Sequence, residues 1–179
     1  MINNDNDLNL NQEDEIGESI TITNEKELMS ITPEQVKKIK SVRIENQTFD
    51  STRRITLSVV FSHNNIEQLF FDNCTFVGSG LWVLCDFYSA TRIGFIRCGL
   101  NCNDLIELLS SSNPYEDIEV LDVSENNFEN KFLFVDALEK RIVGIKMLKT
   151  LIIQDNGFDQ TIIPLLKDES LSFIGEIIL

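Results

Sequence analysis

The segment 118–128, IEVLDVSENNF, carries the pattern that organises this chain. Counted from its first residue, apolar side chains stand at positions 0, 3, 5 and 10, and an asparagine stands at position 8. The alternation around Leu121 predicts a short strand with one buried face. Leu121 and Val123 are therefore expected to point inward, and Asp122 and Ser124 are expected to point outward.

The same frame recurs along the chain at intervals of 24 to 30 residues. Full matches begin at Ile66, Ala90 and Leu148, each with Asn or Cys at position 8. A weaker match begins at Ile39, where glutamine occupies position 8, and a partial one begins at Ile174. Self-similarity with this period predicts one supersecondary unit per repeat, with the units stacked side by side.

The frame resembles the core LxxLxLxx(N/C)xL of the leucine-rich repeat family over about residues 19–179, although Ile, Val and Phe replace most of the Leu. The repeat length resembles the longer class with convex-side helices, as in ribonuclease inhibitor, tropomodulin and the Ran GTPase activator. The resemblance implies an α/β solenoid, a right-handed horseshoe arc of about six to seven short parallel strands with helices on the convex side. In that family the residue at position 8 bonds to the backbone of neighbouring turns, which gives an interior ladder formed by Gln47, Cys74, Cys98, Asn126 and Asn156.

The chain is expected to have two parts. Residues 1–18 are interpreted as a flexible acidic tail, because residues 1–27 hold eight acidic residues and a single basic one and the tail has little apolar material. Residues 19–179 are expected to form the repeat domain. The alternating segment 19–23 is expected to be its N-terminal cap, and the domain is expected to lack a C-terminal cap because Leu179 falls within a strand.

Helices are expected between the strands. Thr32-Pro33-Glu34 is typical of a helix start and leads into residues 35–39. The apolar runs that predict the remaining helices are 81–85, 104–109, 132–138 and 162–166.

The residues that usually carry catalysis are scarce. His63 is the one histidine, so a Ser-His-Asp or Cys-His arrangement has little material. The four cysteines lack the two tight pairs of a zinc site, and Gly78-Ser-Gly80 lacks the remaining residues of a phosphate loop. We therefore expect no enzyme activity, no metal and no cofactor.

Charge and hydropathy limit the classes of partner and the cell compartment that we expect. The 179 residues include 15 Lys and Arg against 29 Asp and Glu, a formal charge of −14, which argues against nucleic acid. No apolar run approaches the roughly 18 residues of a membrane span. Without a signal-peptide pattern or disulfide spacing, a cytoplasmic location is expected, with the nucleus as an alternative.

The outward positions of the strands offer a binding surface. One predicted column across the sheet reads Arg43, Phe70, Gly94, Asp122, Ile152, Ile178. Apolar anchors within a charged rim are typical of protein-binding surfaces. The expected partner-binding residues are Phe70, Asp72, Arg92, Ile96, Arg97, Asp122, Glu125, Ile152 and Asp155. The net negative rim favours a partner with a basic patch.

The leading hypothesis is therefore an adaptor or scaffold that binds another protein on the concave sheet face. One alternative is a structural subunit of a large assembly, whose exposed anchors are covered by neighbours. A further alternative is a small-GTPase activator similar to the Ran activator, although that family's acidic tail is C-terminal and its repeat array is longer.

Overall fold

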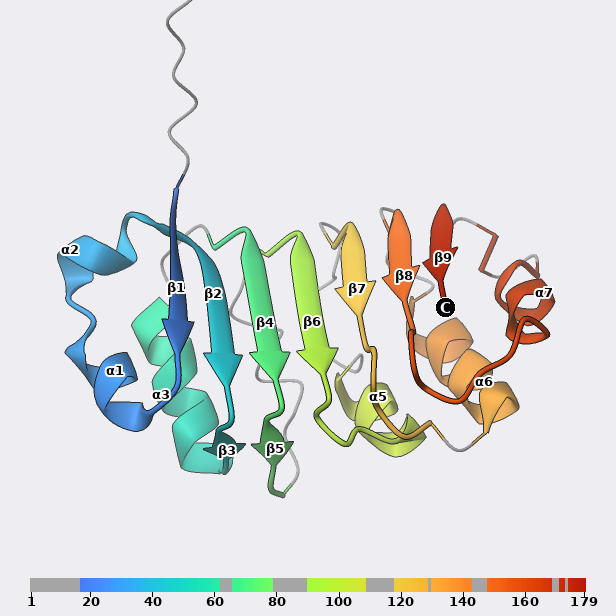
Figure 1. The fold of residues 1–179 in the computed structure, drawn as a ribbon, viewed down its shortest axis with the longest axis horizontal. Helices are drawn as coiled ribbons and strands as arrows, with labels where there is room; N and C mark the ends of the chain where they lie inside the picture. The colour runs from blue at the N-terminus through green and yellow to red at the C-terminus, as the bar shows by residue number, and fades with distance from the viewer. Residues whose placement is uncertain are drawn as a thin grey trace, which may run out of the picture.

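A seven-stranded sheet is the main element of the computed structural model (Figure 1). The strands are β1 (Glu18–Ile22), β2 (Ile39–Glu45), β4 (Gln68–Asp72), β6 (Arg92–Ile96), β7 (Val120–Asp122), β8 (Thr150–Ile152) and β9 (Glu176–Ile178). Each strand pairs in parallel with the next of these along the chain. The structure describes residues 17–61, 66–78, 90–108, 118–128, 130–142, 148–168, 171–172 and 174–179. The expectation of an α/β chain with six to seven short parallel strands is confirmed.

Helices connect the strands. They are α1 (Glu25–Ser30), α2 (Pro33–Val36), α3 (Ser51–Phe61), α5 (Cys102–Leu108), α6 (Lys131–Ile142) and α7 (Ile162–Leu166). Figure 1 shows α3, α5 and α6 behind the sheet, and no described helix lies in front of it. We call the uncovered side the open face. Two short strands, β3 (Thr48–Phe49) and β5 (Thr75–Phe76), pair in parallel below β2 and β4.

The core lies between the sheet and the helices behind it. Leu121 and Val123 are 2% and 0% exposed, which confirms that both point inward. The equivalent residues of the other strands join one core with helix residues such as Leu57 and Leu138. Burial of one strand face is what the alternation in the sequence predicts.

The strand register confirms the predicted outward column. Arg43 lies opposite Phe70, and Phe70 lies opposite Gly94. Gly94 pairs with Asp122, Asp122 with Ile152, and Ile152 with Ile178. A shift of one residue would have exchanged the inward and outward side chains, so the frame identifies both sets correctly.

Phenylalanines fill much of the core. The rings of Phe71 and Phe95 stack with their centroids 5.1 Å apart, and Phe49 and Phe76 contact the Phe71 ring at 5.6 and 5.5 Å. A second group joins Phe128, Phe134 and Phe158. Aromatic pairs at these separations add to the burial of their area.

The helix predictions have mixed outcomes. The last one coincides with α7, α5 begins two residues early, α6 extends beyond both expected ends, and residues 81–85 lie outside the described residues. Thr32 does begin a helix, with a capping box to Gln35, but α2 ends at Val36. The expected continuation through Ile39 is wrong, because Ile39 opens β2 and its side chain enters the core. Neither α1 nor α3 is predicted by the sequence patterns.

Two further predictions concern the N-terminal tail and membrane spans. Glu18 is the first residue of β1, while residues 1–16 of the expected acidic tail lie outside the described residues. Within the described ranges, no helix is long and apolar enough to cross a membrane.

Candidate functional site

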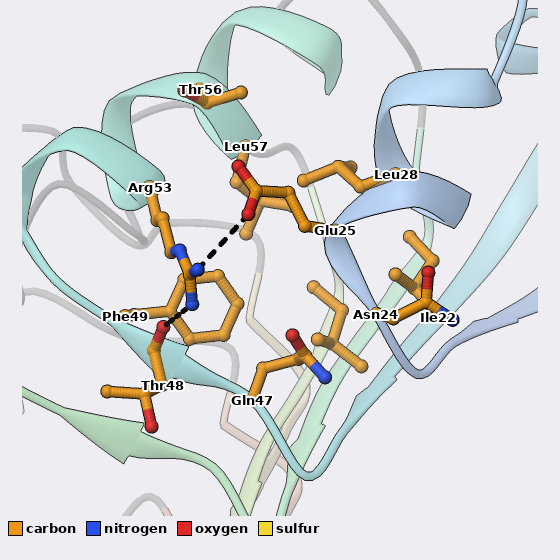
Figure 2. Close-up of a pocket in the computed structure, with 11 residues that line it drawn as sticks. Ile22, Asn24, Glu25, Leu28, Gln47, Thr48, Phe49, Arg53, Thr56 and Leu57 are labelled. Carbon is orange, nitrogen blue, oxygen red and sulfur yellow. Dashed lines mark hydrogen bonds and ion pairs between the residues drawn. The ribbon is translucent and has the colours of Figure 1, made fainter.

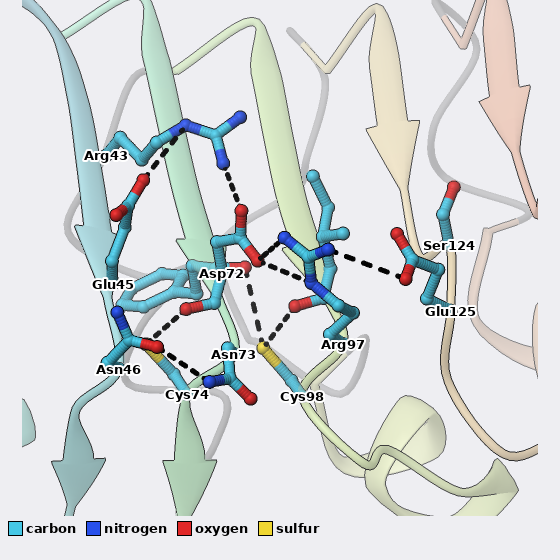
Figure 3. A network of polar contacts seen from close by, with 12 residues as sticks. Arg43, Glu45, Asn46, Asp72, Asn73, Cys74, Arg97, Cys98, Ser124 and Glu125 are labelled. Atoms are coloured by element: carbon cyan, nitrogen blue, oxygen red, sulfur yellow. Dashed lines mark hydrogen bonds and ion pairs between the residues drawn. The ribbon is translucent and has the colours of Figure 1, made fainter.

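A row of charged side chains crosses the open face at the ends of β2, β4 and β6 (Figure 3). Asp72 is 8% exposed, and its Oδ2 accepts a hydrogen bond of 2.5 Å from Arg43 Nη1. Its Oδ1 accepts from Arg97 Nε at 3.0 Å and Nη2 at 2.7 Å, which raises the pKa of the Arg97 guanidinium. Longer ion pairs join Arg43 to Glu45 and Arg97 to Glu125, at 4.0 and 3.6 Å. The charges of this row are therefore largely neutralised among themselves.

Phe70 completes this part of the open face. A Cβ atom on Gly94 would overlap the Phe70 ring, so the ring lies where a side chain at position 94 would otherwise be. The guanidinium carbon of Arg43 lies 5.6 Å from the ring centroid, within the range of a cation–π contact. The Phe70 ring is thus packed against its neighbours and half-buried by them.

Replacing Asp72 with alanine removes the acceptor of three charge-assisted hydrogen bonds. We expect this variant to lose about 1 to 3 kcal/mol of unfolding free energy, because both guanidinium groups keep some access to water. Urea denaturation of wild type and variant measures the difference. Glu125→Ala is the control, since its longer, exposed ion pair should contribute less than about 1 kcal/mol. Equal losses in the two variants would contradict the central role of Asp72.

The turns after the strands share an unusual backbone conformation. One residue in each of five successive turns has a positive φ between 52 and 56°, although none of them is glycine. These residues are Asn46, Asn73, Arg97, Glu125 and Asp155. Asparagine and aspartate tolerate this left-handed region better than most residues, whereas arginine and glutamate seldom occupy it. The conformation places three of the predicted partner-binding residues along one rim of the open face, which we call the turn rim.

The residue after each turn-rim residue is a predicted ladder position, and Asn126 has the most contacts of the five. Its Oδ1 accepts from the backbone N–H groups of Cys98 and Leu100, both at 3.0 Å. Its Nδ2 donates to three carbonyl oxygens, those of Phe95, Val123 and Ser124. The side chain thus pairs backbone groups of two stretches of chain, residues 95–100 and residues 123–124.

The other four ladder side chains also contact backbone groups. Asn156 accepts from the N–H of Asn126 at 2.7 Å and donates to Val123 O at 3.0 Å. Cys74 Sγ lies 3.4 Å from Ile44 O, and Cys98 Sγ lies 3.3 Å from Ile96 O. The amide of Gln47 donates to the carbonyls of Thr23, Glu45 and Asn46.

The Cys98 thiol gives stability a pH dependence. Burial raises its pKa from 9.0 to about 12, so the folded protein holds this proton more tightly than the unfolded chain does. The stabilisation of the folded protein that follows from this raised pKa is fully present below about pH 9 and is lost as the pH rises towards 12. We expect the free energy of unfolding of wild type to fall more steeply in this window than that of Cys98→Ala, by on the order of 1.4 kcal/mol per pH unit. Parallel alkaline profiles in urea would contradict this.

The structure separates some of the predicted partner-binding residues. Arg92 stands at the start of β6, at the opposite end of the strand from Ile96 and the charged row. Asp122 Oδ1 accepts from Ser124 N at 3.0 Å and from Ser124 Oγ at 2.6 Å. Ile152 is half-buried on the open face, and Asp155 is exposed on the turn rim.

A small apolar cavity between α1 and α3 is a feature that sequence patterns did not indicate (Figure 2). Its volume is about 30 Å³, and Ile22, Leu28 and Leu57 are among the residues that line it. Arg53 lies beside it and contacts Glu25 Oε2 at 3.1 Å and Thr48 O at 2.8 Å. A cavity of this size accommodates a water molecule or a methyl group, so we assign it to packing of the first helix.

Other chemistry remains sparse in the part of the chain that the structure describes. No three His, Cys, Asp or Glu side chains there are grouped to hold a metal ion. His63 and Cys85 lie outside the described residues. Comparison with protein-family models, curated protein sequences and solved structures found no significant match.

Proposed function

We propose that this chain is a protein–protein interaction module, an adaptor or scaffold of the leucine-rich repeat type, which binds a partner protein on the open face. The observation that carries the proposal is a set of half-buried apolar side chains among charged ones, on a face that no described helix covers. These side chains are Phe70, Ile96, Ile152 and Ile178. Apolar anchors with a polar rim suit protein recognition. The proposal assigns no catalytic role and no cofactor to the chain, and places it in the cytoplasm or nucleus.

Three features support the repeat type. Strands pair in parallel in chain order, which is the arrangement expected when each repeat contacts only its neighbours. The position-8 side chains hydrogen-bond to backbone groups, including those of neighbouring turns. The turn before each of these positions has the same left-handed residue.

The overall charge supports a protein partner. The chain carries a net charge of −14, which disfavours the phosphate backbone of a nucleic acid. The same charge favours encounter with a basic surface, mainly through the association rate.

The experiment recovers the affinity-tagged chain from its native cell type and compares co-purifying proteins between variants. Phe70→Asp and Ile152→Asp place a charge on the open face. Val59→Asp is the matched control, because Val59 is 68% exposed on α3, which Figure 1 shows behind the sheet. Circular dichroism and urea denaturation establish that each variant folds.

We expect the same partner on wild type and Val59→Asp, and its loss from both open-face variants. A partner retained by Phe70→Asp and Ile152→Asp would contradict the proposal. So would a partner lost equally from all three variants while they remain folded.

One observation favours the structural-subunit alternative. Phe132 and Leu133 are adjacent at the start of α6 and are 62% and 55% exposed, which is unusual for large apolar side chains. A subunit that covers them in an assembly should aggregate when purified alone. Sedimentation of the isolated chain distinguishes the two: a stable monomer supports the adaptor, and association relieved by Phe132→Ser and Leu133→Ser supports the subunit.

A further inference from the structure

The open face has two halves that differ in how their charges are paired. On β2, β4 and β6, Asp72 is already matched by Arg43 and Arg97 (Figure 3). On β7, β8 and β9, the outward positions form what we call the C-terminal half. These positions are Val120, Asp122, Thr150, Ile152, Glu176 and Ile178.

The C-terminal half has an apolar centre. Ile152 lies between Asp122 and Ile178 in the register, and all three side chains are half-buried. Val120 is half-buried on the neighbouring row. The aliphatic groups therefore form a small contact area rather than isolated side chains, and covering them would remove apolar surface from water.

Within the described ranges, the carboxylates around this centre form no ion pair with Lys or Arg. Among the residues that the structure describes, no ion pair reaches Asp122, Asp155 or Glu176. No Lys or Arg occupies an outward position of β7, β8 or β9. Lys149, which precedes β8, is already paired with Glu119 at 2.5 Å. A partner that covers this half without cations would leave carboxylates desolvated and unpaired, which is costly.

We infer that the C-terminal half receives a segment of a partner protein in which an apolar side chain is flanked by lysine or arginine. The apolar side chain contacts Ile152, and the flanking cations pair with Asp155 on the turn rim and Glu176 on β9. This inference rests on the proposed function, which it makes specific by naming the half of the face and the chemistry of the partner. The half formed by β2, β4 and β6 does not require cations from a partner, because the buried carboxylate of Asp72 is already paired with Arg43 and Arg97.

The test selects peptides from a displayed random library against the folded, full-length chain. Enriched peptides are then synthesised and titrated by fluorescence anisotropy against single variants. Asp155→Lys and Glu176→Lys reverse the charges in question, and Ile152→Asp disrupts the apolar centre. Glu34→Lys makes the same change in net charge on α2, away from this half, and is the matched control.

We expect enriched peptides with Lys or Arg on both sides of an aliphatic or aromatic residue. Their affinity should fall about tenfold or more in Asp155→Lys, Glu176→Lys and Ile152→Asp, stay near wild type in Glu34→Lys, and decrease as salt is added.

Four outcomes would overturn the inference. The first is enrichment of peptides without basic residues, and the second is no enrichment beyond that obtained with Ile152→Asp as bait. The third is binding that depends on Phe70 but not on Ile152, Asp155 or Glu176, which would leave the proposed function standing and refute only the assignment to this half. Binding insensitive to every open-face variant would refute both.

Discussion

Replacing Asn126 with alanine is expected to lower the free energy of unfolding by about 3 to 5 kcal/mol. The change removes one acceptor and one donor group that together bond to five backbone groups in a site that is 8% exposed. Val123 O keeps its bond from Asn156, and Ser124 O keeps its bond from Arg97 N, so the loss falls on the other three groups. Each buried backbone group left without a partner costs about 1 to 3 kcal/mol, and relaxation recovers part of the total. The loss is a large share of the stability of a domain of this size, which is about 5 to 15 kcal/mol.

The neighbouring asparagine provides the control for this experiment. Asn127 is exposed, so Asn127→Ala should change the free energy of unfolding by less than about 0.5 kcal/mol. Urea denaturation followed by circular dichroism measures both variants. Similar small losses at the two positions would show that the ladder contacts of Asn126 contribute little.

Replacing Phe71 with alanine is expected to have an effect of similar size. The Phe71 ring is fully buried and contacts three other rings, with centroids 5.1 to 5.6 Å away. Truncation of a core phenylalanine costs about 3 to 5 kcal/mol, through lost burial and the cavity left behind. We therefore expect the urea concentration at the midpoint of unfolding to fall strongly. The slope of the unfolding free energy against urea concentration should stay unchanged.

The variant Phe71→Leu distinguishes the stability lost through reduced buried volume from the stability lost through missing ring contacts. Leucine keeps most of the buried volume, so its loss should be roughly half that of alanine or less. Losses of equal size would indicate that the ring stack, rather than cavity formation, determines the effect. A loss below about 1 kcal/mol for Phe71→Ala would contradict the packing described above.

The strands were the most predictable part of this fold. Residues such as Leu121 and Val123 alternate with polar ones, and alternation alone fixes which face a strand buries. The constant offset of Asn126 from Leu121 fixed the register from one repeat to the next. These are local signals, and they carried the outward column correctly from Arg43 to Ile178.

Helix α3 shows why part of the fold was missed. Its sequence, STRRITLSVVF, is rich in β-branched residues, which have reduced helix propensity. The helix buries Leu57 and Phe61 against the core, so tertiary packing overrides the local preference. Arg54 is 1% exposed and donates to the carbonyls of Phe49 and Val77. A charged side chain at such a position is not expected from sequence, because arginine is seldom fully buried.

The sequence predicted where the residues of the charged row lie on the sheet, but not the contacts that they make. Asp72 and Arg97 were both expected on the rim of the sheet. Their hydrogen bonds depend on the left-handed backbone of Arg97, and arginine gives no sequence signal for that conformation. The pairing that distinguishes the two halves of the open face therefore emerged only from the structure.

Under the proposed function, the turn rim would separate partner recognition from folding. Its five residues share one backbone conformation but carry amide, guanidinium and carboxylate side chains. Backbone hydrogen bonds hold these turns, such as Asn73 N to Ile96 O at 2.9 Å and Glu125 N to Gln154 O at 2.8 Å. Because backbone groups close these turns, side chains of different charge occupy the same position in successive turns while the sheet stays the same. Under the proposed function, substitutions confined to the turn rim would change the choice of partner and leave the sheet in place.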